Sequence, residues 1–172
     1  MFGAALVVGC GDQATVVGPV DLSQAPAALT MTCDHGVGQV AFANPCLVGG
    51  NLASAKLDSV GNHETECSLA GEGGEVAWAF ILPLSAIAQR PDQPLTFQKG
   101  QVSTPPSGQP IEVAGQTASV TDVAGTMTFL RLDPSARAFI GHFQGQIDWL
   151  GANGAFSCTV DADLWGAPGG FI

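Results

Sequence analysis

The feature that most constrains the fold is an alternating pattern near the C-terminus. From Arg137 to Leu150, aromatic residues, aliphatic residues and glycines occupy every second position, and mostly polar residues lie between them. The alternation resumes from Phe156 to Leu164, after a Gly-Ala-Asn-Gly turn. Successive side chains of a β-strand point to opposite faces, so each segment predicts a strand with one buried and one solvated face. With the apolar segment 126–132 before them, they form a predicted three-strand meander.

The rest of the chain predicts short β-strands. The 23 glycines and 11 prolines interrupt it too often for long helices. Clear apolar runs between turn residues lie at 28–33, 38–43, 54–60, 64–69 and 75–82, and residues 118–123 form a further predicted strand before the meander. The run 75–82 is apolar in both phases, which predicts a strand covered on both faces, and residues 83–89 predict one helical turn. About nine short strands with little helix predict an all-β fold, an antiparallel β-sandwich with a small β-barrel as the alternative.

Length and charge limit the organisation and the partners. A chain of 172 residues is long enough for one domain, and 46% hydrophobic residues exclude disorder. We assign residues 28–172 to a single β domain, residues 10–27 to a tether that includes one strand at 15–17, and residues 1–9 to a leader remnant. Five basic residues against fifteen acidic ones exclude a nucleic-acid partner, because phosphate binding needs a basic surface.

The N-terminus resembles the lipobox of bacterial lipoprotein signal peptides. An aliphatic stretch, Leu6 to Val8, precedes the small residue Gly9 and then Cys10. The resemblance implies acylation of Cys10, export, and attachment to the bacterial cell envelope through lipid alone. The run lacks a basic region before it, so we expect upstream residues that complete the leader. The alternative is that Ala4 to Val8 form a first β-strand.

The cysteines predict disulfides. Once Cys10 is assigned to the lipid, four cysteines remain: Cys33, Cys46, Cys67 and Cys158. An exported protein favours disulfides over free thiols, and we expect the pairs Cys33–Cys46 and Cys67–Cys158. The competing zinc site lacks closely spaced ligand pairs, and we predict no metal and no cofactor.

The candidate ligand contacts lie on the last two predicted strands. Asp161 and Asp163 share the polar face of one strand, His142 lies on the polar face of the neighbouring strand, and Trp165 follows the two aspartates in the same phase. An exposed Trp beside carboxylates can stack on a sugar ring. The alternatives for the two aspartates are a solvated face, calcium binding with help from Asp148, and glycosidase-type catalysis by the carboxyl pair. The alternative for Trp165 is a ring folded over the edge of the sheet.

No catalytic motif is present in the sequence. It lacks a nucleophile elbow, a phosphate-binding loop and a dinucleotide fingerprint, and we predict no catalytic residue and no enzymatic activity. We expect a non-enzymatic binding, adhesion or assembly module of the envelope, with an unknown protein or glycan as its partner. The alternatives are a carbohydrate-binding module and, third, a small hydrolase.

Overall fold

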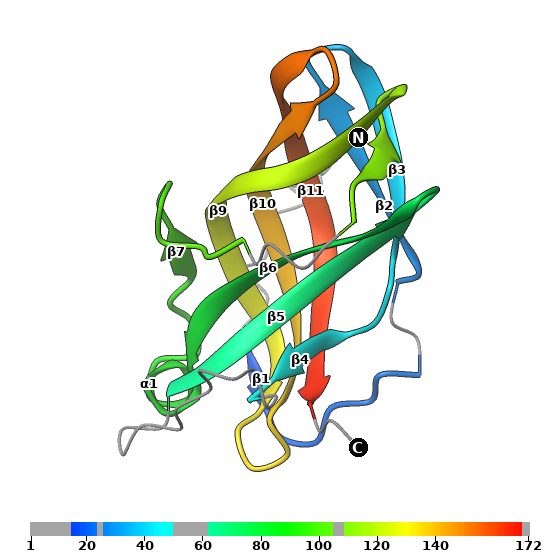
Figure 1. The fold of residues 1–172 in the computed structure, drawn as a ribbon. Coiled ribbons are helices and arrows are strands. Elements are labelled where there is room, and N and C mark those ends of the chain that lie inside the picture. Colours follow the sequence, from blue (N-terminus) through cyan, green and yellow to red (C-terminus); the bar gives the residue numbers. More distant parts are fainter. Residues whose placement is uncertain (1–14, 24–25, 50–61, 105–108, 170–172) are drawn as a thin grey trace, which may run out of the picture.

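The computed structural model describes residues 15–23, 26–49, 62–104 and 109–169. These residues form eleven β-strands and one short helix (Figure 1). The elements in chain order are β1 (Val16–Val17), β2 (Ala28–Cys33), β3 (Gly36–Phe42), β4 (Cys46–Val48), β5 (Asn62–Gly71), β6 (Gly74–Pro83), α1 (Leu84–Gln89), β7 (Leu95–Phe97), β8 (Ile111–Val113), β9 (Gln116–Asp133), β10 (Ala138–Gly151) and β11 (Gly154–Pro168). The all-β prediction is confirmed.

The C-terminal meander is confirmed and is longer than predicted. β10 pairs antiparallel with β9 on one side and with β11 on the other over almost its whole length. We expected two strands at 118–123 and 126–132, but β9 is continuous through both segments. The register between β9 and β10 shifts at two places, near Ile140 and near Asp148. Such bulges let a long strand keep its partner while it bends.

The sheet closes into a small mixed barrel, the alternative to the sandwich that we placed first. β11 pairs antiparallel with β2 and parallel with β4, so β11, β2, β3, β5 and β4 form a closed ring. The remaining strands extend this ring, and the β5–β6 hairpin crosses in front of β10 and β11 (Figure 1). Closure depends on β4, which has three residues, and so short a strand leaves no alternating pattern in a sequence.

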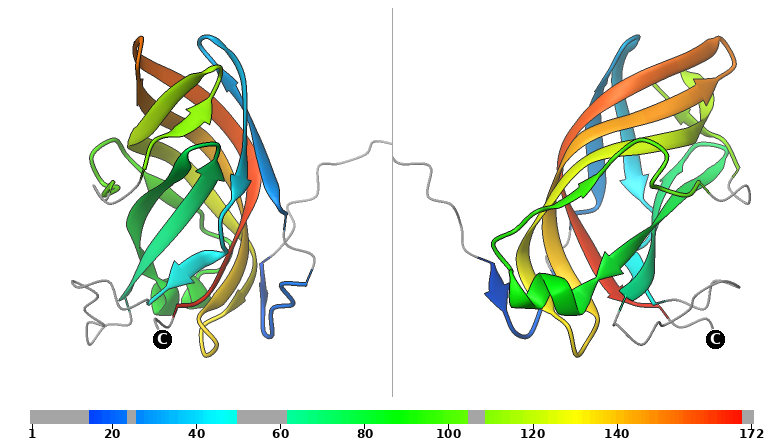
Figure 2. Two further views of the ribbon diagram at one scale, coloured as in Figure 1. Left: turned by 45° about the vertical axis from the view of Figure 1, so that its right-hand side comes forward. Right: turned by 90° about the vertical axis from the view of Figure 1, so that its left-hand side faces the viewer.

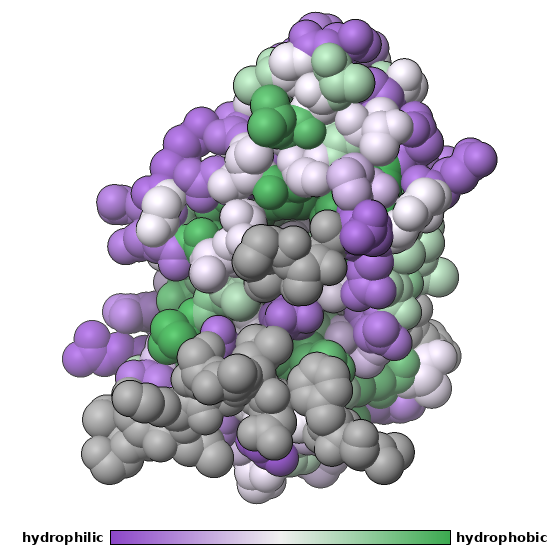
Figure 3. Space-filling view, in the orientation of Figure 1, coloured by the Kyte–Doolittle hydropathy of each residue, from purple (hydrophilic) through white to green (hydrophobic). Residues whose placement is uncertain are grey.

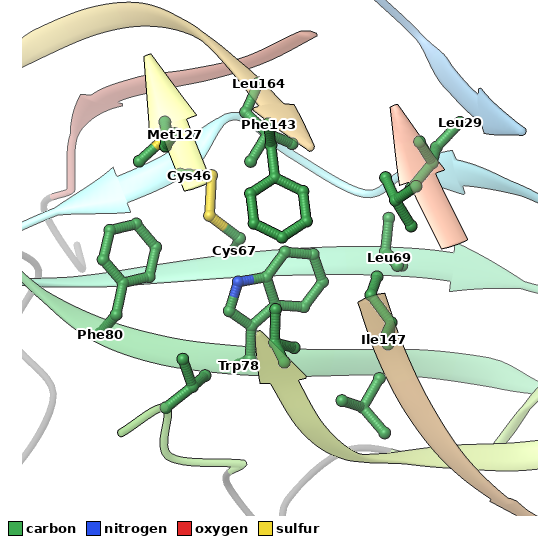
Figure 4. Packing of buried hydrophobic residues seen from close by; sticks show 14 of the residues in the cluster. Leu29, Cys46, Cys67, Leu69, Trp78, Phe80, Met127, Phe143, Ile147 and Leu164 are labelled. Atoms are coloured by element: carbon green, nitrogen blue, oxygen red, sulfur yellow. A yellow bond between two sulfur atoms is a disulfide. The ribbon is translucent and has the colours of Figure 1, made fainter. Parts of the chain in front are cut away.

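The core lies between the β5–β6 hairpin and the meander. Trp78 of β6 points toward Phe143 of β10, beside the Cys46–Cys67 disulfide (Figure 4). Glycines on the strands make room for aromatic rings. A Cβ at Gly166 would lie 2.1 Å from Cε1 of Phe139, its register partner on β10. Only a residue without a side chain fits beneath this ring.

β6 is buried on one face and only in part on the other, contrary to the prediction of a strand covered on both faces. Val76, Trp78, Phe80 and Leu82 are buried, as expected for one phase. On the other phase Ala79 is buried, but Ile81 is 57% exposed. Hydropathy alone therefore overestimated the burial of this strand, because an apolar residue can remain at the surface.

Two disulfides join the four cysteines that we predicted, but in a different pairing. The bonds are Cys33–Cys158 and Cys46–Cys67. Cys33 and Cys158 are register partners on β2 and β11, and Cys46 and Cys67 lie opposite each other on β4 and β5. The expected pairs were wrong because sequence spacing does not show which strands are neighbours. Two disulfides indicate an extracytoplasmic protein.

α1 and β1 lie at one end of the barrel (Figure 2). α1 follows Pro83, within the residues where we predicted a helical turn, and buries Leu84 and Ile87. β1 is the strand expected at 15–17, and it pairs parallel with β9. Cys10 and the predicted strand at 54–60 lie outside the described residues.

Candidate functional site

The outer face of the meander is a continuous polar surface. Cross-strand register aligns its side chains in rows: Thr128, His142 and Asp163 form one row, and the next rows follow at two-residue steps. We call this surface the polar face and define it by the residues Thr126, Thr128, His142, Gln144, Gln146, Asp148, Ser157, Thr159, Asp161 and Asp163. These residues include three carboxylates and no Lys or Arg, and Asp122, the register partner of Asp148 on β9, adds a fourth carboxylate at the edge of the face.

His142 joins the two predicted aspartates. Its Nδ1 lies 2.9 Å from an oxygen of Asp163, and its Nε2 lies 2.9 Å from an oxygen of Asp161. The Nε2 amide of Gln144 donates to the second oxygen of Asp161, also at 2.9 Å. The sequence placed these three candidate residues on one face, and the structure confirms that they are in contact. Both carboxylates remain more than half exposed, so a partner can reach them.

Both ring nitrogens of His142 face carboxylates: Nδ1 faces Asp163, and Nε2 faces Asp161. In this arrangement neither nitrogen is free to act as the general base toward a hydroxyl group, which is the role of a histidine beside a serine nucleophile.

Asp148 organises the other end of the polar face. Its carboxylate accepts hydrogen bonds from the Lys99 ammonium at 2.6 Å, from the Ser157 hydroxyl at 2.7 Å and from the Gln146 amide. Burial acts to raise the pKa of Asp148, but these hydrogen bonds, led by that from Lys99, outweigh it and hold the pKa below its usual value. The group is therefore an ordered anion paired with a lysine.

Trp165, the predicted stacking residue, is not available to a ligand. It is only 7% exposed, and its ring packs edge-to-face against Phe42 of β3, with ring centroids 4.8 Å apart. The phase was predicted correctly, but the end of β3 covers this position. The alternative that we named for Trp165, a ring folded over the sheet edge, is the one that the structure supports. The prediction that this ring stacks on a sugar was therefore wrong.

The structure adds residues that the sequence analysis did not select. Gln146, Ser157 and Lys99 belong to the hydrogen-bonded network of the polar face. The first two share the alternating phase with His142 and Asp161, so that phase was a usable signal. Lys99 comes from the segment after β7, and nothing in its neighbourhood in the sequence indicates its contact with Asp148.

The described residues contain no group of three His, Cys, Asp or Glu side chains placed to hold a metal ion. No helix among them is long and apolar enough to cross a membrane.

Comparison of the chain with protein-family models, with curated proteins and with solved structures gives no match. The function therefore has to be inferred from the geometry of the molecule.

Proposed function

We propose that the protein is an exported cell-envelope domain, attached by a lipid at Cys10, that binds a basic protein partner through the polar face. The observation that carries this proposal is the His142 cluster, in which Asp161 and Asp163 are exposed and held in place by a shared imidazole. Ordered, exposed carboxylates bind a complementary basic surface with little loss of side-chain entropy.

The charge of the whole chain supports a basic partner. The formal net charge is −10, so long-range electrostatic attraction favours cationic proteins and disfavours anionic lipid surfaces and nucleic acids. The opposite side of the molecule differs from the polar face. Figure 3 shows hydrophobic patches dispersed among hydrophilic residues on the β5–β6 side, whereas the meander presents rows of polar side chains.

The partner proposal can be tested by site-specific photocrosslinking in the native envelope. A photoreactive residue at Gln144 should give a discrete protein adduct, and the same residue at Glu112, which is exposed on β8, should not. The yield of the adduct should fall in 0.5 M salt, because salt screens the attraction between surface charges. Equal yields at both positions, or a yield that rises with salt, would contradict the proposal.

Two double variants that remove the same number of negative charges separate the effect of the polar face from that of net charge. The double variant Asp161→Asn/Asp163→Asn should lose the adduct, and Glu72→Gln/Glu112→Gln, which removes the same charge from exposed positions elsewhere, should keep it. If both double variants lose the adduct equally, net charge and not the polar face is responsible.

The anchor requires a separate measurement. The intact mass of the purified native protein should correspond to a chain that begins at Cys10, carries acyl groups and lacks four hydrogens for its two disulfides. Cys10→Ala should be found in the soluble fraction. A native chain that retains residues 1–9 without acylation would refute the anchor and leave the partner proposal standing.

A further inference from the structure

An open pocket lies between α1 and the start of β7, away from the polar face. Its volume is 330 Å³, within the range of small-molecule sites. The apolar part of its lining consists of Ala86 and Ile87 from α1 and of Pro94 and Leu95 from the segment that enters β7. Ile87 is buried beneath the pocket, whereas Ala86 and Pro94 are exposed and Leu95 is half-buried, so these last three offer a hydrocarbon chain an apolar surface from which it displaces water.

The charge of the pocket is unusual for this protein. Arg90 lines it together with glutamines such as Gln93, and none of the described lining residues is acidic. Arg90 makes no ion pair with another described residue, whereas Lys99, for comparison, is paired with Asp148. An unpaired guanidinium in a chain of net charge −10 is therefore the group that selects the ligand's charge.

The backbone holds Arg90 at the rim of the pocket. The Arg90 amide donates to the carbonyl oxygens of Ala86 and Ile87, which ends α1 at this residue. The backbone N–H of Gln93 donates to the backbone carbonyl oxygen of Arg90 at 3.0 Å and closes a turn. The Thr15 hydroxyl contacts the carbonyl oxygens of Pro91 and Phe129 and so fastens this turn to β9. The rim is thus anchored to the barrel.

We propose that this pocket binds a small amphiphilic carboxylate, whose carboxylate pairs with Arg90 and whose hydrocarbon chain covers Ala86, Pro94 and Leu95. A guanidinium matches the planar, two-oxygen geometry of a carboxylate and can bind it through two parallel hydrogen bonds. The adjoining apolar wall selects a chain in place of a bare ion such as acetate. The proposal is independent of the partner that we assign to the polar face.

The test is an amide NMR titration of the full chain with octanoate. Octanoate should shift the resonances of residues 86–95 and bind at least tenfold more tightly than octanol, which lacks the charge, or octylammonium, which reverses it. Equal binding of octanoate and octanol would overturn the proposal. So would octanoate shifts confined to other exposed apolar residues, such as Val37 and Leu150.

Three variants make the test specific to the pocket. Arg90→Gln should weaken octanoate binding at least tenfold, whereas Arg131→Gln, which removes an exposed cation from β9, should leave it unchanged. Ala86→Trp should abolish binding by filling the pocket, and the unperturbed resonances of the meander will show that this variant is folded. Retention of parental affinity by Arg90→Gln would refute the assignment.

Discussion

Two carboxylates show how individual residues set the pH dependence of stability. Glu66 lies half-buried on β5, between β4 and β6. Burial raises its pKa, and the nearby carboxylates of Glu75 and Glu64 raise it further. The pKa of Asp148 is instead lowered by its hydrogen bonds. The two groups therefore contribute to stability with opposite dependence on pH.

We predict that Glu66→Gln stabilises the protein at neutral pH. A folded pKa above the unfolded value means that the ionised Glu66 opposes folding, and this cost appears as the pH rises through the folded pKa. The gain at pH 7 should stay below about 1 kcal/mol, since water screens a half-exposed group. Urea unfolding at pH 7 and pH 3 measures it, with Glu72→Gln as the control. A stabilisation that is equally large at pH 3 would contradict the prediction.

Asp148→Asn should show the reverse behaviour. A folded pKa below the unfolded value stabilises the native state at pH values above the unfolded pKa, and the effect disappears as the pH falls through the folded pKa. We expect a loss of about 1 kcal/mol at pH 7, because a charge-assisted network is broken at the surface. The deficit should shrink on acidification in the same unfolding series. A constant deficit down to pH 2 would indicate a packing effect and not loss of the charge.

At the scale of elements, the meander depends on a close approach between β9 and β10. Gly125 and Gly145 are register partners. A Cβ at Gly145 would lie 2.2 Å from the carbonyl oxygen of Ala124 and 2.7 Å from Cα of Gly125. Both atoms belong to the backbone and cannot rotate away, so the two strands can keep their spacing only with glycine at this crossing.

Gly145→Ala should therefore destabilise the protein by about 2 kcal/mol or more, the range for forcing an extra carbon into a packed site. Thr128→Ala, an exposed change on β9, should cost well under 1 kcal/mol. Chemical denaturation monitored by tryptophan fluorescence compares them. Equal effects of the two substitutions would mean that the strands can separate here without cost.

At the scale of the whole molecule, each disulfide joins two strands that share few register pairs, and we call such a pairing a short seam. β2 and β11 share three register pairs, and β4 and β5 share two. Each of these short seams carries one disulfide, whereas the extensive seams between β10 and its neighbours carry none. The short seams between β3 and β5, with two register pairs, and between β11 and β4, with three, carry none, so the disulfides reinforce two of the four short seams of the ring.

Removal of the two disulfides should have unequal effects. Cys33–Cys158 spans 125 residues and Cys46–Cys67 spans 21. In the chain-entropy model the double variant Cys33→Ala/Cys158→Ala should lose about 5 kcal/mol, and Cys46→Ala/Cys67→Ala about 3 kcal/mol. Thermal unfolding of both variants against the parent protein tests the order. A reversed order would show that native packing, and not the restricted unfolded chain, dominates the effect.

The sequence by itself determined the local features of this protein. Alternation predicted the strands of the meander and their buried faces, and it placed His142, Asp161 and Asp163 on the polar faces of neighbouring strands. These properties follow from the two-residue period of a strand and from pairing between adjacent segments. The parity of the cysteines identified those that form disulfides.

Tertiary structure alone decided the features that join distant segments. The ring is closed by β4, Trp165 is covered by Phe42, and Cys33 pairs with Cys158 across strands remote in sequence. The pocket at Arg90 likewise lies beside a turn after α1 that Thr15 joins to β9. Local periodicity reports which face of a strand is apolar, but it carries no information about which other segment covers that face.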